Sequence, residues 1–334
     1  MAKLLTVAVT GPTGEVGKPF VDRLDRNPEV ERIVGMARRP FDVAACGWGK
    51  VDYRRGDILD RDAVAALVDG ADVVVHLAFV IVAGSGRSRE INLTGSRNVF
   101  EATAAGGAQR LVYTSSVAAY GFQADSPELL TEDLPPRGAD RHPYSAQKAE
   151  VEAELARALA GSGTDAYVFR PCIVAGPKAP LLLDSIPLER LRRRLPSPLR
   201  AVFERVPAVR PVLPDPGVPF QLVHHDDVAA ALEAAVLGKA RPGVYNLAGP
   251  GRLTVSDLAA ELGWHAARIP GAAVTTAAEL VARTPFLPDE AAWVEAFRRP
   301  VLMDVTRART ELGWRPRHDA RETLRQTVAA WRDR

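Results

Sequence analysis

The sequence is poor in cysteine and contains no long hydrophobic run. Its 334 residues include only two cysteines, Cys46 and Cys172, which lie far apart in the chain. Such a pair provides neither a disulfide framework nor a paired-cysteine metal site, and it fits a reducing cytosol. No apolar stretch approaches the roughly 20 residues of a membrane helix, and the apolar start is too short for a signal peptide. We therefore expect a cytoplasmic protein that does not enter a membrane.

A strong net charge is also missing. The formal charge of +2 is too small to indicate a nucleic acid or a membrane surface as partner. The six histidines include the adjacent His224 and His225, yet no HxxxH or HxH spacing typical of metal ligands. The sequence thus predicts no metal site. With 47% hydrophobic residues, the composition is that of a globular protein, for which we expect a small-molecule substrate.

The first half of the chain alternates short apolar runs with helical segments. Continuous apolar runs of this length, separated by helices, are typical of a parallel sheet that is covered on both faces. We therefore predict an α/β fold with a Rossmann-type, doubly wound parallel sheet and a smaller C-terminal substrate-binding lobe. The predicted strands are 4–11, 31–38, 71–79, 110–116 and 166–174, and the two clearest helices are 92–105 and 144–161.

The second half departs from this alternation. Residues 178–219 are rich in Leu, Pro and Arg and are interpreted as an insertion over the active site. A helix is expected over 223–238, with Asp226 and Asp227 near its start, followed by a strand over 243–249 and a helical remainder. We assign 1–177 and 219–250 to the dinucleotide-binding domain, and 178–218 and 251–334 to the substrate-binding lobe.

A glycine-rich loop follows the first predicted strand. The segment TGPTGEVG contains Gly11, Gly14 and Gly17. In such a loop the first glycine permits a tight turn, the second lets a pyrophosphate approach the backbone, and the third lets the helix pack against the sheet. The helix N-terminus then offers N–H groups and a positive dipole end to phosphates. The loop therefore predicts a dinucleotide site that includes Thr13, Glu15 and Val16.

Together with later motifs, this loop resembles the extended short-chain dehydrogenase/reductase family, in its epimerase/dehydratase-like branch. The resemblance implies that Asp57 and Ile58 flank the adenine, that Leu77 and Ala78 flank a ribose, and that Pro171 and Ile173 lie beside the cofactor. The matching motifs are GDILD (56–60), VVHLAF (74–79), NLTGSRNV (92–99), YTSSVAAYG (113–121), YSAQK (144–148), RPCIVAGP (170–177), VHHDDVA (223–229) and ELGWRP (311–316).

The residues after the second predicted strand bear on the choice of cofactor. About 20 residues past the last glycine, NAD enzymes carry an acid that binds the ribose 2′-hydroxyl. Here Ala37 takes that place and Arg38 and Arg39 follow. A guanidinium can hold a 2′-phosphate through two hydrogen bonds. We therefore predict NADP in preference to NAD, although the two arginines could simply be solvated.

A catalytic trio is predicted from three motifs. Tyr144 and Lys148 are four residues apart in a helix, so their side chains share one face. A nearby ammonium and an oxidised nicotinamide would both lower the pKa of the tyrosine, which can then transfer a proton to or from a substrate oxygen. By resemblance, Ser116 is the hydroxyl that polarises this oxygen, and Asn92 supports a water relay to Lys148.

Three departures from the family pattern bear on the substrate. Val117 and Ala118 stand where sugar dehydratases carry Asp-Glu, and Ile173 stands where nucleotide-sugar enzymes carry Asn. The usual Arg-Asp-Phe before VHHDDVA is also missing. We therefore favour a carbonyl reductase or alcohol dehydrogenase. The expected substrate contacts are Phe79, Ser116, Val117 and Cys172, and an anionic group could bind Arg192, Arg193 and Arg194 unless these form a solvated face.

Two other functions and the assembly state stay open at this point. A sugar or nucleotide-sugar epimerase would use the same trio with a tightly bound NAD(P). A redox-sensing binding module is a third hypothesis, but such modules typically lack the Tyr or Lys that this chain retains. A homodimer through helices 92–105 and 144–161 is expected from the resemblance. The apolar stripe of Val151, Leu155, Ala158 and Leu159 supports it, or faces the sheet instead.

Overall fold

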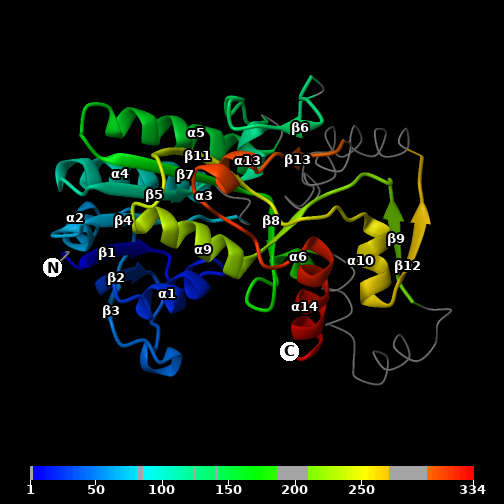
Figure 1. Ribbon diagram of the computed structural model, residues 1–334, viewed down its shortest axis with the longest axis horizontal. Coiled ribbons are helices and arrows are strands. Elements are labelled where there is room, and N and C mark those ends of the chain that lie inside the picture. Colours follow the sequence, from blue (N-terminus) through cyan, green and yellow to red (C-terminus); the bar gives the residue numbers. More distant parts are fainter. Residues whose placement is uncertain (1–2, 82–85, 124, 140–141, 187–209, 271–298) are drawn as a thin grey trace.

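The computed structural model describes residues 3–81, 86–123, 125–139, 142–186, 210–270 and 299–334. Its centre is a seven-stranded, fully parallel sheet with the order β11-β7-β5-β4-β1-β2-β3 (Figure 1). This order confirms the predicted α/β doubly wound fold. The strands are β1 (Leu5–Thr10), β2 (Val30–Ala37), β3 (Val51–Arg55), β4 (Val73–His76), β5 (Arg110–Thr114), β7 (Asp165–Pro171) and β11 (Gly243–Leu247).

Helices cover both faces of the sheet (Figure 1). On one face, α1 (Gly17–Asp25) and α9 (His225–Val236) pack together and bury residues such as Phe20 and Leu232 in one core cluster. On the other face, α2 (Arg61–Val68), α4 (Ser96–Ala105) and α5 (Pro143–Leu159) bury residues such as Phe100 in a second cluster. Because the strands are covered on both sides, their apolar runs are continuous rather than alternating.

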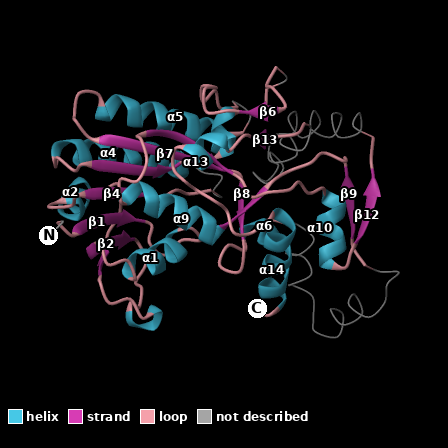
Figure 2. Ribbon diagram, viewed as in Figure 1, coloured by secondary structure: helices cyan, strands magenta, loops and turns pink. Residues whose placement is uncertain are grey.

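A smaller lobe lies beside the sheet, to the right in Figure 2. Its core joins residues such as Leu183, Leu258 and Trp331. Asp227 in α9 contacts the segment before α14, because its carboxylate accepts hydrogen bonds from the backbone N–H groups of Arg317 and His318. The lobe contains α6 (Leu181–Asp184), β9 (Val212–Asp215), α10 (Val255–Leu262), β12 (His265–Arg268) and α14 (Ala320–Arg332).

The other described elements are short. Strand β8 (Ile173–Ala175) pairs with β10 (Leu222–His224), and β6 (Leu129–Leu130) pairs with β13 (Leu302–Met303). The helical turns are η1 (Ala44–Cys46), α3 (Gly86–Glu90), η2 (Ile91–Gly95), η3 (Val117–Tyr120) and α13 (Thr306–Thr310). Within the described ranges, no helix combines the length and the hydrophobicity needed to span a bilayer.

Several sequence-based boundaries need correction. The run 166–174 is two strands, because β7 ends at Pro171 and β8 pairs with β10 outside the main sheet. The helix expected from 223 begins at His225, after β10. The remainder is not wholly helical, since β12 and β13 interrupt it. The arginines at 192–194 lie outside the described residues.

The apolar stripe of α5 faces the sheet. Val151, Leu155 and Leu159 are buried in the same cluster as the strand residues Leu111 and Val168, and Ala158 packs against that cluster. The side chains of this stripe are therefore packed inside the protomer and do not form a surface for a second copy. The outer face of α5 instead presents exposed alanines and ion pairs, including Arg97 with Glu154.

Candidate active site

The sequence motifs meet at the carboxyl ends of the central strands. Strand β1 lies between β2 and β4, which is where the strand order reverses. In open parallel sheets this reversal forms the crevice that binds ligands. Gly11 follows β1, Leu77 and Ala78 follow β4, and Ser116 lies two residues after β5. The fold thus brings the expected cofactor loop and the catalytic serine to one edge of the sheet.

The glycine loop has the backbone geometry of a phosphate cradle. Gly11 has a φ of +72°, and a Cβ there would lie 2.8 Å from the Ala78 nitrogen. A Cβ on Gly17 would lie only 2.2 Å from the Gly11 carbonyl oxygen. In the part of the chain that the structure describes, the N–H groups of Thr13, Glu15 and Val16 donate to no protein acceptor. Free N–H groups before a helix suit a pyrophosphate, so the loop fits a dinucleotide.

The adenosine end of the expected site is bordered by β2 and β3. Asp57 accepts a hydrogen bond from the Leu59 backbone at 3.1 Å, and Ile58 is buried against Gly95. Arg38 and Arg39 are exposed, and only their carbonyl oxygens are bound, by Arg55 and Tyr53 respectively. Both guanidinium groups are therefore available to a ligand, as far as the described residues show.

Glu15 links the glycine loop to the lobe. Its carboxylate accepts a hydrogen bond from the Leu181 backbone N–H at 3.0 Å, at the start of α6. Burial raises the pKa of Glu15 to about 7, and the neighbouring Asp184 acts in the same direction, whereas Arg334 and the Leu181 hydrogen bond act against it. A negative charge thus develops in the phosphate-binding loop as the pH rises through neutrality.

We predict that Glu15→Gln tightens cofactor binding at alkaline pH. Removing the carboxylate charge should improve the dissociation constant of NADP by about three- to tenfold at pH 8, roughly 0.7–1.4 kcal/mol. Little change is expected at pH 6, where the carboxyl group is already protonated. Fluorescence titration at both pH values measures this, with Glu29→Gln as an exposed control. Equal ratios at pH 6 and pH 8 would contradict the assignment.

Ser116 and Tyr144 are brought together as expected. Ser116 precedes η3, and its Oγ accepts a hydrogen bond from the Ala118 backbone at 3.1 Å. Tyr144 lies in the first turn of α5, which begins at Pro143 after the N-cap His142. Burial raises the pKa of Tyr144, and its hydrogen bond with Ser116 acts in the opposite direction. The two hydroxyl groups can therefore share one substrate oxygen.

Lys148 lies one turn farther along α5, and its ammonium group is buried. Nζ donates to the Thr114 carbonyl at 2.8 Å and to the Tyr113 hydroxyl at 3.2 Å. It also lies 3.7 Å from the ring centroid of Phe79, whose ring meets that of Tyr144 edge-on. Burial lowers the pKa of Lys148 to about 7. The expected lowering of the Tyr144 pKa by this ammonium is not found here; burial dominates instead.

Asn92 is buried in the π-helical turn η2. Its amide group binds the backbone of Val80 at 2.8 and 2.9 Å and donates to Gln147 at 2.7 Å. The side chain thus holds the loop after β4 against α5. A water relay from Asn92 to Lys148 stays a prediction.

The remaining predicted residues follow β5 and β7. Val117 packs against the core beside the trio. Pro171 is the strand neighbour of Leu247 in the main sheet, and Ile173 is the strand neighbour of Leu222 in the small sheet of β8 and β10. Cys172 is buried in the core, and burial raises the pKa of its thiol. Their contacts with cofactor or substrate stay predictions.

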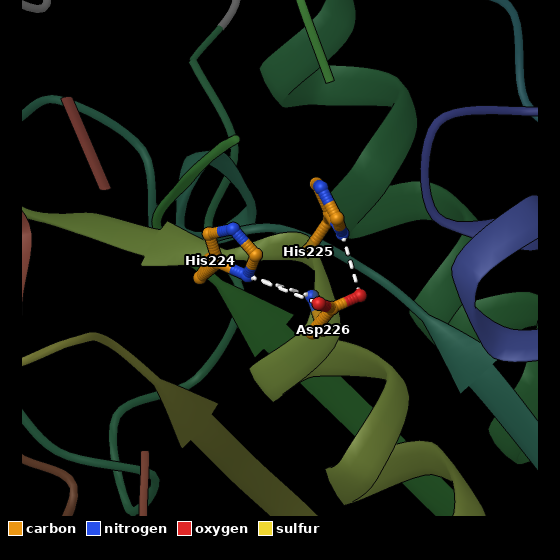
Figure 3. A group of neighbouring side chains, drawn as sticks. All are labelled: His224, His225 and Asp226. Carbon is orange, nitrogen blue, oxygen red and sulfur yellow. Dashed lines mark hydrogen bonds and ion pairs between the residues drawn. The ribbon is translucent and has the colours of Figure 1, made fainter. Parts of the chain in front are cut away.

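His224, His225 and Asp226 form a cluster that sequence spacing did not indicate (Figure 3). His224 Nδ1 accepts a hydrogen bond from the Asp226 backbone at 3.2 Å, and His225 Nε2 accepts one from Lys178 at 3.1 Å. The other nitrogen of His225 lies 2.9 Å from the Asp226 carboxylate. His224 is thus the N-cap of α9, while its Nε2 is buried without a hydrogen-bond partner among the described residues.

Sequence analysis did not identify Tyr113 as a partner of Lys148. It belongs to the motif YTSSVAAYG, and alternation along β5 would place its side chain opposite those of its neighbours. That alternation indicates on which face of the sheet the Tyr113 side chain lies, but it does not indicate its partner Lys148, which is 35 residues away in the sequence.

Known proteins share the family and the fold of this chain. Residues 7–248 match the model of the NAD dependent epimerase/dehydratase family. An uncharacterized protein of Mycobacterium tuberculosis is 30% identical over 335 residues, which is 99% of this chain but only 30% of that relative. The human 3 beta-hydroxysteroid dehydrogenase type 7 is 34% identical over 166 residues, covering 45% of this chain and 44% of that enzyme.

A solved structure shows the same architecture over almost the whole length. MoeE5 in complex with UDP-glucose and NAD superimposes with a TM-score of 0.71 at 23% identity, covering 98% of each chain. The family match includes residues from all seven strands of the parallel sheet. This chain belongs to the NAD dependent epimerase/dehydratase family.

Proposed function

We propose that the chain is an NADP(H)-dependent oxidoreductase of the carbonyl reductase or alcohol dehydrogenase type, acting on an organic metabolite in the cytoplasm. The observation that carries the proposal is the placement of Ser116, Tyr144 and the buried Lys148 together, with Ser116 close enough to Tyr144 to lower the pKa of its phenol. A bound nicotinamide would supply or accept the hydride. The protein's own groups then have to hold the substrate oxygen and move one proton.

Each residue of the trio has a distinct task in this proposal. Ser116 holds the substrate oxygen by a hydrogen bond, and Tyr144 donates its phenolic proton to that oxygen in reduction or removes it in oxidation. Lys148 favours the phenolate when its ammonium group is charged. Because burial alone raises the pKa of Tyr144, a charged Lys148 and an oxidised nicotinamide must together offset that effect.

The substrate proposal rests on apolar surroundings. Phe79 lies edge-on to Tyr144, and the half-buried Ile173 stands where an Asn would hold a diphosphate. Both side chains suit a neutral carbonyl compound better than a charged one. The partial match to human 3 beta-hydroxysteroid dehydrogenase type 7 supports the same class of chemistry.

A sugar or nucleotide-sugar epimerase is the second candidate. It is favoured by the family match and by the shared fold with a structure that binds UDP-glucose and NAD. An epimerase returns the hydride to its substrate and keeps its cofactor bound, whereas a reductase exchanges it. Copurification of NAD(P) would favour this candidate.

We predict that UDP-sugars bind poorly. A diphosphate needs paired donors when it leaves water, and Ile173 offers none from its side chain, so the dissociation constants should be no better than roughly millimolar. Titration calorimetry with UDP-glucose and UDP-galactose in the presence of NADP measures this. Micromolar binding of either would favour the epimerase and count against the reductase.

We also propose a homodimer through α4 and α5. The outer face of α5 carries the exposed Ala153 and Ala156, which permit close approach of a second helix. Glu154 lies between them and pairs with Arg97 and Arg157. Such a face would pack through small residues and ion pairs rather than through the apolar stripe.

For the dimer, light scattering at micromolar concentration should give twice the protomer mass of 36.0 kDa. Ala156→Glu should yield the protomer mass, because a buried, unpaired carboxylate opposes association. Ala65→Glu, on the exposed side of α2, is the matched control and should leave the dimer intact. A wild-type mass of one protomer would refute this assembly.

A further inference from the structure

A group of polar side chains is buried directly beneath the catalytic trio. Relative exposures are 3% for Lys148, 1% for Tyr113, 3% for Ser115, 8% for Glu152 and 2% for Arg170. They come from three neighbouring elements, β5, α5 and β7. Burying so many polar groups costs folding free energy unless each has a hydrogen-bond partner.

Polar contacts connect the group. Lys148 Nζ donates to the Tyr113 hydroxyl at 3.2 Å, and Ser115 lies close enough to Tyr113 to lower the pKa of its phenol. The Ser115 hydroxyl donates to Glu152 Oε1 at 2.5 Å. Tyr113 and Ser115 therefore place two hydroxyl groups between Lys148 and Glu152.

The chain ends on a buried ion pair. Arg170 donates to both carboxylate oxygens of Glu152, at 3.0 and 2.6 Å, and its guanidinium lies 4.4 Å from the ring centroid of Tyr120. Glu152 is four residues after Lys148, so the two side chains share the face of α5 that also carries Tyr144. The carboxylate therefore acts on Lys148 both across space and through the hydroxyl groups.

Other titratable groups near Lys148 contribute little charge. His76 on β4 is fully buried, and burial lowers its pKa to about 3, so its imidazole is neutral. Burial raises the pKa values of Tyr113 on β5 and Tyr144 on α5, so both phenols are neutral. Among the described residues, Glu152 and its partner Arg170 are thus the charged groups that matter most to the lysine.

We propose that Tyr113, Ser115 and Glu152 form a positioning chain that holds the Lys148 ammonium in place and keeps it charged, with Arg170 fixing the far end. Its catalytic consequence rests on the proposed function, because a charged Lys148 is what favours the Tyr144 phenolate. The chain itself exists in the protein alone and can be tested without substrate or cofactor.

The pKa of Lys148 reports directly on this chain. Burial lowers it to about 7, and Glu152 is the group that raises it. Removing the Tyr113 hydroxyl takes away one acceptor of the ammonium, and removing the Glu152 charge takes away its electrostatic support. Both changes favour the neutral amine and should lower the pKa further.

The test is a carbon-13 NMR titration of protein labelled at lysine Cε. The chain has six lysines, and loss of one signal in Lys148→Met assigns the relevant resonance. The wild-type signal should titrate near pH 7. Tyr113→Phe and Ser115→Ala should lower the midpoint by at least about 0.5 pH unit, and Glu152→Gln by at least about 1 unit. Tyr167→Phe, whose hydroxyl donates to the Ala240 carbonyl, is the control and should change nothing.

Equal midpoints in wild type, Tyr113→Phe and Ser115→Ala would overturn the proposal, as would an equal shift in Tyr167→Phe. Glu152→Gln leaves Arg170 without its partner and can unfold the protein, but Tyr113→Phe and Ser115→Ala keep every charge and carry the test alone. With an active substrate in hand, the lower midpoints should also move the acidic limb of the oxidation rate to higher pH. Absence of turnover would count against the proposed function and leave the titration result intact.

Discussion

Tyr144→Phe is expected to lower kcat at least about 100-fold, the range of a lost general acid or base. The phenol oxygen is the only part removed. The ring keeps its edge-on contacts with Phe79 and His142, at centroid distances of 5.6 and 6.3 Å. NADP affinity should therefore stay within a few-fold of wild type. Steady-state kinetics with a turned-over carbonyl compound, together with cofactor titration, measure both quantities.

Tyr167→Phe is the matched control for this variant. Its hydroxyl binds the Ala240 carbonyl at 2.9 Å, away from the trio, and the change should leave kcat nearly unaffected. If Tyr144→Phe keeps even a tenth of wild-type kcat, the phenol is not the proton carrier and the assignment of the trio is wrong.

The double variant Arg38→Ala/Arg39→Ala should shift cofactor preference towards NAD. A lost charge-assisted contact to the 2′-phosphate costs about 1.5–3 kcal/mol, so NADP should bind roughly ten- to a hundredfold more weakly. NAD, which lacks that phosphate, should bind within about threefold of wild type. Both side chains are exposed and unpaired among the described residues, so the fold should not change. Titration of the two cofactors side by side measures the shift.

Arg32→Ala serves as the control for the arginine pair. Arg32 is exposed on β2, the strand that precedes the two arginines, and pairs with Asp52, so its loss should alter neither dissociation constant. Equal losses for NADP and NAD in the double variant would mean that Arg38 and Arg39 do not contact the phosphate.

The sequence was sufficient to predict the central strands of the sheet, but not its polar edge strand. Buried strands such as β1 appear as continuous apolar runs because helices cover both faces. Strand β3, VDYRR, was not predicted, because it is an edge strand with only half-buried or exposed residues. Strand β12, HAAR, is exposed throughout and has no alternating pattern either.

Those parts of the site that lie within short sequence motifs could be predicted. The glycine loop and the Tyr-x-x-x-Lys pair are short, and each carries its geometry in its own spacing. The contacts that adjust their charges are not local. Glu15 contacts Leu181 across 166 residues of sequence, and Arg170 on strand β7 binds Glu152 on helix α5. No periodicity in one sequence indicates such pairs, because the topology of the whole sheet brings them together.

The central claim is that this chain performs nicotinamide redox chemistry with Tyr144 as proton carrier. The most direct test is a panel of carbonyl compounds and nucleotide sugars, mixed with NADPH or NADH and followed by the absorbance of the reduced nicotinamide. We predict that NADPH is consumed with at least one apolar carbonyl compound and that Tyr144→Phe abolishes the signal. Unchanged absorbance across the panel despite tight cofactor binding, or consumption that persists in Tyr144→Phe, would contradict the claim.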